Sequence, residues 1–318
     1  MTKILITGSS GQLGTDLIEA LAQKHGQENL IGLDLHESRN GKDLGCFEQA
    51  DATNKQAVED IIKKHDVKQV YHLASLLSAS GEKNPDLAWE VNMSSLKHIL
   101  DLAKEYGYQI FWPSSIAAFG PSTPKNQTPQ ATVLDPNTMY GITKITGELL
   151  CNYYFEKWGV DTRSVRYPGL ISYRTLPGGG TTDYAVEMYY EALKGKKYTC
   201  FVREDTALPM MYMPDAVKGA IEILEAPAKG ISIRQSYNLT AMSFKAKELE
   251  EEIKKHVPGF ECTYKPDERQ EIADSWPKSV DDSRARVDWG WKPDYDLAAM
   301  TVDMLQKLKE KGITREVE

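Results

Sequence analysis

The chain has 318 residues, of which 41% are hydrophobic and 26% charged, the composition of a folded globular protein with one large domain or two coupled ones. Its net charge of −8 disfavours a nucleic-acid or anionic-membrane surface, and no apolar run approaches the roughly 20 residues of a membrane span. Four scattered cysteines and a first strand that begins at Lys3 predict a cytoplasmic protein without a signal peptide. The six histidines lack ligand spacing, so no metal site is expected.

Short apolar runs alternate with helical patterns through the first half of the chain. Apolar residues recur at i, i+3, i+4 spacing in three segments, so helices are expected at 12–25, 55–65 and 86–106, and Gly107 is expected to end the last one. The expected strands are 3–6, 30–33, 46–50, 69–73, 109–113 and 161–167. This alternation predicts an α/β fold built on a doubly wound parallel sheet of the Rossmann type.

The pattern changes after residue 170. A helix is expected at 182–194 and another at 214–225, and a strand at 236–240 is expected to rejoin the sheet. We therefore predict a smaller C-terminal substrate lobe that is interleaved with the nucleotide-binding domain. The predicted domain covers 1–170 plus about 214–245, and the predicted lobe covers 171–213 and 246–318.

A glycine-rich turn at 7–14 follows the first strand and opens the first helix, and an acid, Asp34, ends the second strand about 20 residues later. In a dinucleotide site, Gly8 permits the tight turn, Gly11 lets backbone N–H groups approach the pyrophosphate, and Gly14 lets helix and strand pack closely. Asp34 would accept hydrogen bonds from the ribose and repel a 2′-phosphate, which favours NAD over NADP, although Arg39 nearby would soften that preference. The alternative is a glycine-rich turn without a cofactor.

The expected cofactor contacts extend past this turn. Asp51 either meets the adenine amino group or caps the helix that follows it. Asn92 lies in the long helix, where it either bonds neighbouring backbone beside the active-site lysine or is solvated. The full set of expected contacts is Gly8, Ser10, Gly11, Gln12, Leu13, Asp34, Leu35, Asp51, Ala52, Leu73, Ala74, Ser75, Asn92, Tyr140, Lys144 and Tyr167.

Tyr140 and Lys144 are four residues apart, which places them on one face of a helix. A nearby ammonium favours phenolate and brings the tyrosine pKa closer to working pH. Ser115 follows a predicted strand, at the edge of the sheet where ligands bind. Its hydroxyl can hold a substrate oxygen while Tyr140 takes the proton. The sequence therefore predicts Ser115, Tyr140 and Lys144 as a catalytic set for oxidising or reducing an alcohol.

The chain resembles the extended short-chain dehydrogenase/reductases over nearly its whole length. The shared motifs are TGSSGQLG at 7–14, DAT at 51–53, HLAS at 72–75, SSIAAFG at 114–120, YGITK at 140–144 and RYPG at 166–169. Within that superfamily it is most similar to the NAD-dependent L-threonine 3-dehydrogenases of the epimerase-like type. The narrower resemblance rests on LLSASGE at 76–82, PGGGTTDYAVEMYYEAL at 177–193, LPMMYMPDA at 208–216 and SWPKSVDDSRARVDWGWKPDYDL at 275–297.

Nucleotide-sugar epimerases and dehydratases of the same fold are the alternative. The sequence departs from them at Gly169, where those enzymes have an asparagine that meets the sugar-nucleotide phosphate, and at Ile116-Ala117, where dehydratases have an acidic pair. The substrate lobe also lacks a basic cluster for a second diphosphate. A third hypothesis is a dinucleotide-sensing protein that has lost catalysis, but an intact Ser/Tyr/Lys set argues against it.

The resemblance implies oxidation of the L-threonine 3-hydroxyl to 2-amino-3-oxobutyrate by a homodimer that pairs through helices near 86–106 and 140–157. Asp183 is the implied acceptor for the substrate ammonium, and serine and threonine hydroxyls are the implied donors to its carboxylate. Thr181, Thr182 and Asp183 are equally suited to cap the helix that follows. The implied substrate contacts are Ser78, Ser80, Ser114, Ser115, Tyr140, Gly178, Thr181, Thr182 and Asp183.

Overall fold

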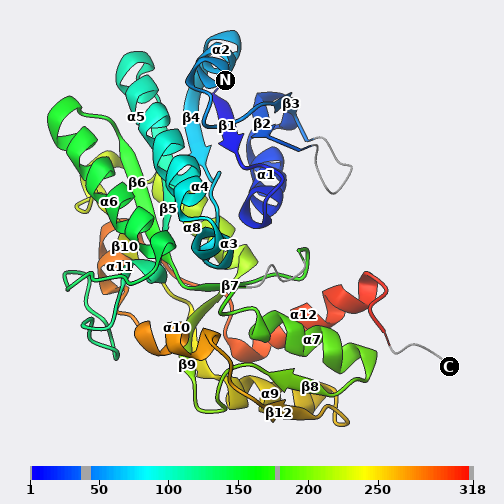
Figure 1. Ribbon diagram of the computed structural model, residues 1–318. Helices are drawn as coiled ribbons and strands as arrows, with labels where there is room; N and C mark the ends of the chain where they lie inside the picture. The colour runs from blue at the N-terminus through cyan, green and yellow to red at the C-terminus, as the bar shows by residue number, and fades with distance from the viewer. Residues whose placement is uncertain (1, 37–43, 176–179, 315–318) are drawn as a thin grey trace.

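A computed structural model describes residues 2–36, 44–175 and 180–314 (Figure 1). Its central feature is a parallel seven-stranded sheet in the order β10-β6-β5-β4-β1-β2-β3. The strands are β1 Lys3–Thr7, β2 Leu30–Asp34, β3 Cys46–Gln49, β4 Val67–His72, β5 Gln109–Ser115, β6 Thr162–Tyr167 and β10 Tyr237–Asn238. The strand order reverses at β1, which confirms the predicted doubly wound arrangement.

Helices cover both faces of this sheet, because the side chains of each buried strand alternate between two apolar layers. Ile4 and Ile6 face the layer that includes α1 and α8, whereas Leu5 faces the layer beneath α2, α5 and α6. The bounds are α1 Gln12–His25, α2 Lys55–His65, α5 Ser95–Tyr106, α6 Met139–Trp158, α8 Met213–Glu225 and α11 Ser283–Trp289. Single-turn 3₁₀ segments lie at Gln27–Asn29, Ile116–Ala118 and Ala228–Gly230.

The expected helix over 86–106 is interrupted. It consists of α4 (Pro85–Trp89), a π-helical segment at Glu90–Ser94, and α5, which ends at Gly107 in a left-handed conformation as predicted. A π turn inserts one residue into the helical repeat and rotates the side chains within it. Asn92 lies in this turn and is buried, so the interruption directs its amide inward.

A second group of elements forms the smaller lobe, in the lower half of Figure 1. Its three-stranded sheet has the order β11-β9-β7, and a two-stranded pair joins β12 to β8. Their bounds are β7 Gly169–Ile171, β8 Tyr198–Cys200, β9 Ala207–Tyr212, β11 Met242–Lys245 and β12 Cys262–Tyr264. The helices are α7 Tyr184–Lys194, α9 Ala246–His256, α10 Arg269–Ser275 and α12 Leu297–Glu310, and the short α3 Ser78–Lys83 follows β4 in the larger domain.

Two elements lie across the predicted domain division. Strand β11 was expected in the nucleotide-binding domain, but it pairs with β9 of the lobe. Helix α11 was expected in the lobe, but its Ala285 and the following Trp291 pack in the layer of α1 and α8. We therefore propose that the nucleotide-binding domain comprises 1–168, about 213–240 and 283–291, the last of these being α11 and the two residues after it.

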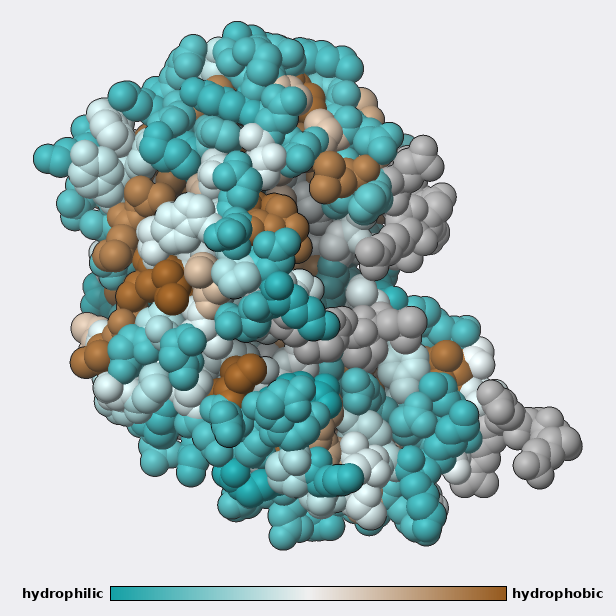
Figure 2. Space-filling model, viewed as in Figure 1, coloured by the Kyte–Doolittle hydropathy of each residue, from teal (hydrophilic) through white to brown (hydrophobic). Residues whose placement is uncertain are grey.

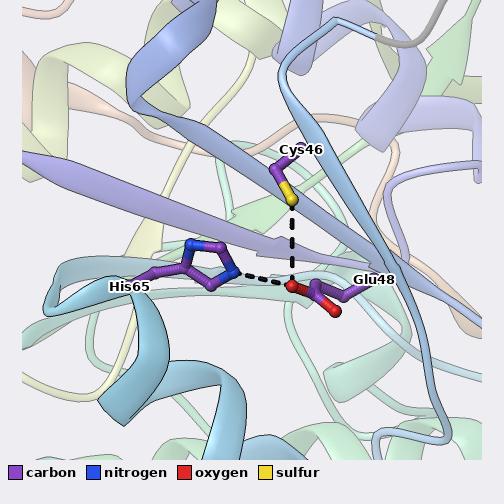
Figure 3. A group of neighbouring side chains, drawn as sticks. All are labelled: Cys46, Glu48 and His65. Carbon is purple, nitrogen blue, oxygen red and sulfur yellow. Dashed lines mark hydrogen bonds and ion pairs between the residues drawn. The ribbon is translucent and has the colours of Figure 1, made fainter.

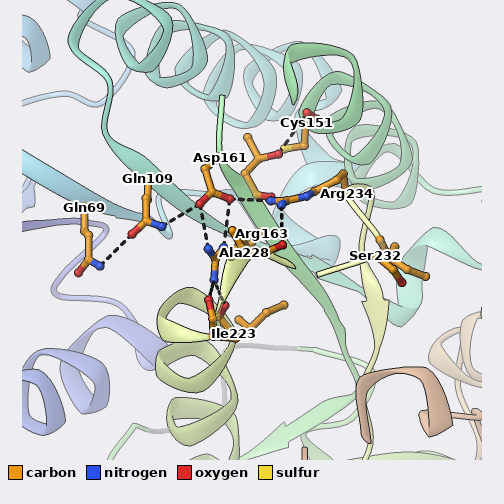
Figure 4. A network of polar contacts seen from close by, with 12 residues as sticks. Gln69, Gln109, Cys151, Asp161, Arg163, Ile223, Ala228, Ser232 and Arg234 are labelled. Carbon is orange, nitrogen blue, oxygen red and sulfur yellow. Dashed lines mark hydrogen bonds and ion pairs between the residues drawn. The ribbon is translucent and has the colours of Figure 1, made fainter. Parts of the chain in front are cut away.

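A polar network fixes β10 and α8 to the rest of the sheet (Figure 4). The Asp161 carboxylate accepts hydrogen bonds from Gln109, Arg163 and Arg234. Arg163 is 2% exposed and also donates to the carbonyl of Ile223, near the end of α8, and to that of Ala226, just after the helix. Because a buried guanidinium needs several acceptors, this network ties a late segment of the chain to the first half.

A second buried ion pair lies between β6 and α6. The Arg166 guanidinium donates to both oxygens of Glu148, at 2.9 and 2.7 Å, and the Ser114 hydroxyl donates to the same carboxylate at 2.6 Å. Arg166 and Glu148 are 2% and 1% exposed. Their mutual charge and these hydrogen bonds offset the cost of removing both from water.

None of the helices within the described ranges is both long and apolar enough to cross a membrane. The four cysteines are all free thiols, with Cys151 and Cys200 buried.

The first prediction concerns Glu148. Glu148→Gln leaves the Arg166 charge buried and uncompensated, so we expect the free energy of unfolding to fall by about 3–5 kcal/mol in urea denaturation. Adding Arg166→Met to the same protein removes the orphaned charge and should restore part of the loss. A single variant as stable as wild type would show that this pair does not hold α6 against β6.

Candidate active site

The glycine-rich turn has the geometry that a pyrophosphate site requires. Gly8 has φ +71°, and a Cβ there would lie 2.8 Å from the Ala74 backbone nitrogen. A Cβ at Gly14 would lie 2.2 Å from the Gly8 carbonyl oxygen. Helix α1 begins at Gln12 without a side-chain cap, so its first N–H groups face the turn. Only glycines fit this approach of backbone to backbone, and the uncapped helix start suits an anion.

Asp34 ends β2 beside this turn, as predicted. Its carboxylate accepts hydrogen bonds from the backbone N–H of Ser10, at 3.0 Å, and of His36, at 3.3 Å. Those bonds fix the carboxylate at the carboxyl edge of the sheet, where an acid can accept from ribose hydroxyls. Leu35, predicted beside the cofactor, is exposed. Arg39 lies outside the described residues.

Asp51 does not cap α2, so the helix-cap alternative predicted for this residue is wrong. Asn54 is the N-cap, and its side chain accepts from the Ala57 N–H at 3.2 Å. Asp51 instead accepts hydrogen bonds from the N–H and hydroxyl of Thr53 in a turn before the helix. Its contact with adenine stays a prediction, as does that of the neighbouring Ala52, which is buried.

The segment after β4 is held beneath the turn by Asn92. The Asn92 amide accepts from the Leu76 N–H at 2.7 Å and from the Ser75 hydroxyl, and donates to the Leu76 carbonyl and the Thr143 hydroxyl. Bonding to backbone was the partner expected for this residue, and the solvated alternative is wrong because Asn92 is 3% exposed. Asn92 therefore positions residues 73–76, predicted to pass under the cofactor, and couples them to α6 through Thr143.

Ser115, Tyr140 and Lys144 come together at the carboxyl end of β5. The Ser115 hydroxyl lies close enough to the Tyr140 phenol to lower its pKa, and it accepts a hydrogen bond from the Ala117 N–H at 3.1 Å. The Lys144 ammonium donates to the Pro113 carbonyl at 2.8 Å and lies 5.2 Å from the centre of the Tyr140 ring. The predicted catalytic residues thus form one continuous polar arrangement.

Local packing makes this arrangement possible. A Cβ at Gly141 would lie 2.2 Å from the Ala117 carbonyl oxygen, and one at Gly147 would lie 2.3 Å from the Trp112 ring. These two glycines let α6 approach β5 closely enough for Lys144 to lie over Trp112, 4.6 Å from the ring centre. The roles of Trp112 and the Pro113 carbonyl were not predicted from the sequence. Their only signal was their place just before Ser115 at the end of a buried strand.

Burial governs the ionisation of both catalytic groups. It raises the pKa of the Tyr140 phenol to about 12, and the hydrogen bond with Ser115 lowers it in part. It lowers the pKa of the Lys144 ammonium to about 7, against the opposing charge of Glu148. In the protein without a ligand, burial therefore has a larger effect on the pKa of Tyr140 than the charge of Lys144, which was expected to lower it. A positively charged ligand beside the phenol is needed to bring its pKa toward working pH.

The side chains of two predicted ligand contacts, Ser114 and Tyr167, point away from the Ser115, Tyr140 and Lys144 cluster. Ser114 is 2% exposed and donates to Glu148, on the opposite face of β5 from Ser115. Tyr167 is 4% exposed, donates to the Ala216 carbonyl, and packs against Phe111. Successive residues of a strand face opposite sides, so only one of the two serines can reach a substrate beside Tyr140. Only the backbone of Tyr167 can reach the cofactor.

The predicted substrate segment lies against β7. A Cβ at Gly169 would lie 2.4 Å from Met210 and 2.7 Å from Thr182, so the absence of a side chain there lets Thr182 approach the sheet edge. Thr181 is 3% exposed. Asp183 is the first residue before α7, but its carboxylate accepts from the Gly180 N–H at 2.6 Å and makes no cap bond to the helix. Gly178 lies outside the described residues.

The loop after β4 reaches the same region. Glu82 of α3 accepts a hydrogen bond from the Met139 N–H at the first turn of α6, one residue before Tyr140. Ser78 is partly buried and Ser80 is exposed within α3. The link through Glu82 places both serines on an element beside the catalytic tyrosine.

A charged contact that the sequence did not reveal joins the lobes. Arg174, after β7, pairs with Asp16 at 2.9 Å and with Glu19, both on α1. Burial raises the pKa of Asp16 to about 6, and the Arg174 charge opposes that shift. The first helix of the dinucleotide turn is therefore tied to the strand end that leads into the substrate segment.

A dinucleotide turn, an acid on β2 and a Ser/Tyr/Lys set at the same sheet edge define a nicotinamide-dependent enzyme of the short-chain dehydrogenase type. The chain belongs to the NAD-dependent epimerase/dehydratase family, which matches residues 4–239. An uncharacterised epimerase/dehydratase of Staphylococcus haemolyticus is 49% identical over 98% of this chain and 99% of its own length.

Two solved structures resemble the chain closely. The GalE-like L-threonine dehydrogenase of Cupriavidus necator, in its holo form, is 52% identical with a TM-score of 0.94 over 96% of this chain and 99% of its own. A monomeric L-threonine 3-dehydrogenase from a metagenome is 49% identical with a TM-score of 0.93 over 97% and 99%. UDP-glucose 4-epimerase of Thermotoga maritima shares the fold, with a TM-score of 0.86 over 98% and 99%, at only 19% identity.

The second prediction follows from the depressed pKa of Lys144. Between pH 7 and its ordinary value of 10.5, the unfolded chain holds a proton on Lys144 that the folded chain does not. Stability therefore rises with pH across this window by up to about 1.4 kcal/mol per pH unit from this residue. We measure the unfolding free energies of wild type and Lys144→Met in urea without cofactor at several pH values. The wild-type value should rise relative to that of the variant with this slope as the pH increases. A pH-independent difference would contradict the buried, depressed lysine.

Proposed function

We propose that this protein oxidises the 3-hydroxyl of L-threonine to 2-amino-3-oxobutyrate with NAD as the hydride acceptor. The observation that carries the proposal is the Tyr140 phenol, which lies beside Ser115 and one helical turn from the buried Lys144. High identity over the full length to L-threonine dehydrogenases supports the substrate. The family name covers epimerases as well, but the solved epimerase is only 19% identical to this chain, against 49–52% for the L-threonine dehydrogenases.

The residues of the turn and of β2 fit the dinucleotide, because Gly8 and Gly14 let the turn pack closely on its neighbouring backbone and the uncapped start of α1 faces the turn. Asp34 would hold the adenosine ribose, and Lys144 and Tyr140 would face the nicotinamide end. When bound, NAD supplies the acceptor for the hydride that leaves the threonine Cβ.

The protein's own residues handle the proton. Tyr140 as phenolate accepts the hydroxyl proton of the substrate, while the Ser115 hydroxyl donates a hydrogen bond to the same oxygen and fixes it near the phenol. Lys144, protonated, stabilises the phenolate charge from one helical turn away. The pKa of about 12 that burial gives Tyr140 means that added positive charge in the site decides how much phenolate forms.

We propose that groups complementary to the two charged ends of threonine lie near Tyr140. We assign the ammonium to Asp183 and the carboxylate to hydroxyls of Ser80, Thr181 and Thr182, with Ser78 on the same side. The close approach of Thr182 to Gly169 supports this assignment, because it brings the segment to the edge of the sheet. An asparagine at position 169 would collide with it, so a site for a sugar-nucleotide phosphate is disfavoured there.

The third prediction tests the phenol. Tyr140→Phe should lower kcat for L-threonine by about 10²-fold or more, since it removes the general base. NADH formation is followed spectrophotometrically, and Tyr153→Phe, an exposed tyrosine of the same helix, is the matched control that should keep wild-type turnover. Near wild-type activity of Tyr140→Phe would contradict the proposed role.

The same assay separates the alternatives. Wild-type protein with NAD should reduce it with L-threonine and should leave UDP-glucose unchanged. Conversion of UDP-glucose to its 4-epimer without net NADH would favour the epimerase, and NAD binding without turnover of either substrate would favour a sensor.

We also propose that the protein is a homodimer. Exposed apolar side chains of α6 recur at positions 142, 149 and 153, on one helical face, and Leu87 and Trp89 of the adjacent α4 extend it. Figure 2 shows hydrophobic side chains on the side of the molecule where α6 lies. A contiguous exposed apolar surface of this kind is typical of an interface. One protein of similar fold is described as monomeric, so the proposal of a dimer rests on the exposed side chains of this chain and not on its fold.

The fourth prediction tests that surface. Leu149→Glu should convert a dimer into a monomer, because it places a charge on the apolar face, and analytical ultracentrifugation at micromolar concentration measures the change. Val287→Glu, on α11, is the control that should stay dimeric, since Val287 is 78% exposed on a helix that packs in the layer of α1 and α8. A monomeric wild-type protein would refute the proposal.

We further propose a cytosolic location. Four free thiols without a disulfide support it, because reduced cysteines are usual in that compartment.

A further inference from the structure

Three potential metal ligands converge outside the catalytic site, between β3 and the end of α2 (Figure 3). The Cys46 Sγ lies 3.8 Å from Glu48 Oε1, and the His65 Nε2 lies 2.7 Å from the same oxygen. All three ligand atoms lie within 4.8 Å of one another. Because each ligand of a tetrahedral ion lies about 2.0–2.3 Å from the metal, its ligand atoms are roughly 3.3–3.6 Å apart, so the short His65–Glu48 contact would lengthen as an ion binds.

The fold brings these residues together for a simple reason. Cys46 and Glu48 are two apart on a strand, so their side chains leave the same face. In the parallel register they lie beside Ile31 and Leu33, which pack in the layer that α2 covers. His65 is the last residue of α2 and faces that same surface. The cluster begins at the first residue of β3, away from the turn that would hold the dinucleotide.

We propose that Cys46, Glu48 and His65 form a binding site for Zn²⁺ or a similar borderline-soft divalent cation, with water in the fourth position. A thiolate, an imidazole and a carboxylate are the ligand types that zinc takes in proteins, and three protein ligands plus water is an established set. Mg²⁺ and Ca²⁺ are disfavoured, because they require mostly oxygen ligands and only one carboxylate is present.

Charge balance suits such an ion. A Cys46 thiolate and a Glu48 carboxylate together neutralise a divalent cation, and the thiol proton passes to solvent as the metal–sulfur bond forms. Lys64 would compete with the metal ion for Glu48, because its ammonium donates a hydrogen bond to Glu48 Oε1 at 2.7 Å. Lys64 is 63% exposed at its side chain, so this pair is weak and a metal ion can displace the ammonium toward water.

The location assigns the metal a structural rather than a catalytic effect. β3 is the edge strand of the seven-stranded sheet, and a bound ion would cross-link it to α2. Because the ion would bind the folded chain and not the unfolded one, it would raise stability by linkage. None of the three ligands belongs to the catalytic set, so the catalytic rate at saturating NAD and threonine should not change.

The fifth prediction uses Co²⁺ and Zn²⁺ salts with metal-free, reduced full-length protein. Co²⁺ should produce a thiolate-to-cobalt absorption band in wild type at one ion per chain, and Zn²⁺ should displace it. Zn²⁺ at about a hundredfold excess over Kd should also raise Tm by roughly 5 °C. Cys46→Ser should abolish the band and His65→Gln should weaken binding by about tenfold or more. Cys262→Ser, which removes the other partly exposed thiol, is the matched control and should bind as wild type.

Lys64→Met distinguishes a metal site from a simple hydrogen-bonding cluster around Glu48. Loss of the competing ammonium should tighten Zn²⁺ binding several-fold if Glu48 is a ligand. Absence of the band and of the Tm shift in wild type, or their persistence in Cys46→Ser, would overturn the proposal.

Discussion

The buried ammonium of Lys144 is the contact on which the active site depends. It is 3% exposed, and its hydrogen bond to the Pro113 carbonyl joins α6 to the end of β5. A cation in that position requires close packing of helix on strand, which Gly141 and Gly147 permit. The cost of burying it appears in its low pKa, and the Glu148 carboxylate offsets part of that cost. The surrounding fold therefore holds an unfavourable charge beside Tyr140, a feature that is common at functional sites.

The same region links the two lobes. The Tyr140 ring packs against the core of the smaller lobe although its helix belongs to the larger domain. Arg174 joins the end of β7 to α1 through Asp16 and Glu19, and Gly169 accommodates Thr182. Binding of a dinucleotide along α1 and binding of a small substrate near Thr182 would thus act on connected elements.

The shared fold of dehydrogenases and sugar-nucleotide epimerases explains why the cofactor motifs alone do not identify a substrate. Both need a dinucleotide turn and a tyrosine that moves a proton. What differs is the edge of the smaller lobe, where this chain places glycine at position 169 and a short threonine-containing segment against it. A side chain at position 169 would collide with Met210 and Thr182, so the glycine is required by the packing of this segment on β7.

The sequence by itself determined the strands of the sheet, the glycine turn and the pairing of Tyr140 with Lys144, because these depend on local periodicity and on spacing within one helix. Tertiary structure decided that the two adjacent serines face opposite sides of β5, since Ser114 donates to Glu148 of α6 whereas Ser115 lies beside Tyr140. It also decided the π turn at Asn92 and the meeting of Cys46 with His65. Those features rest on contacts between residues far apart in the chain, and local sequence carries no record of them.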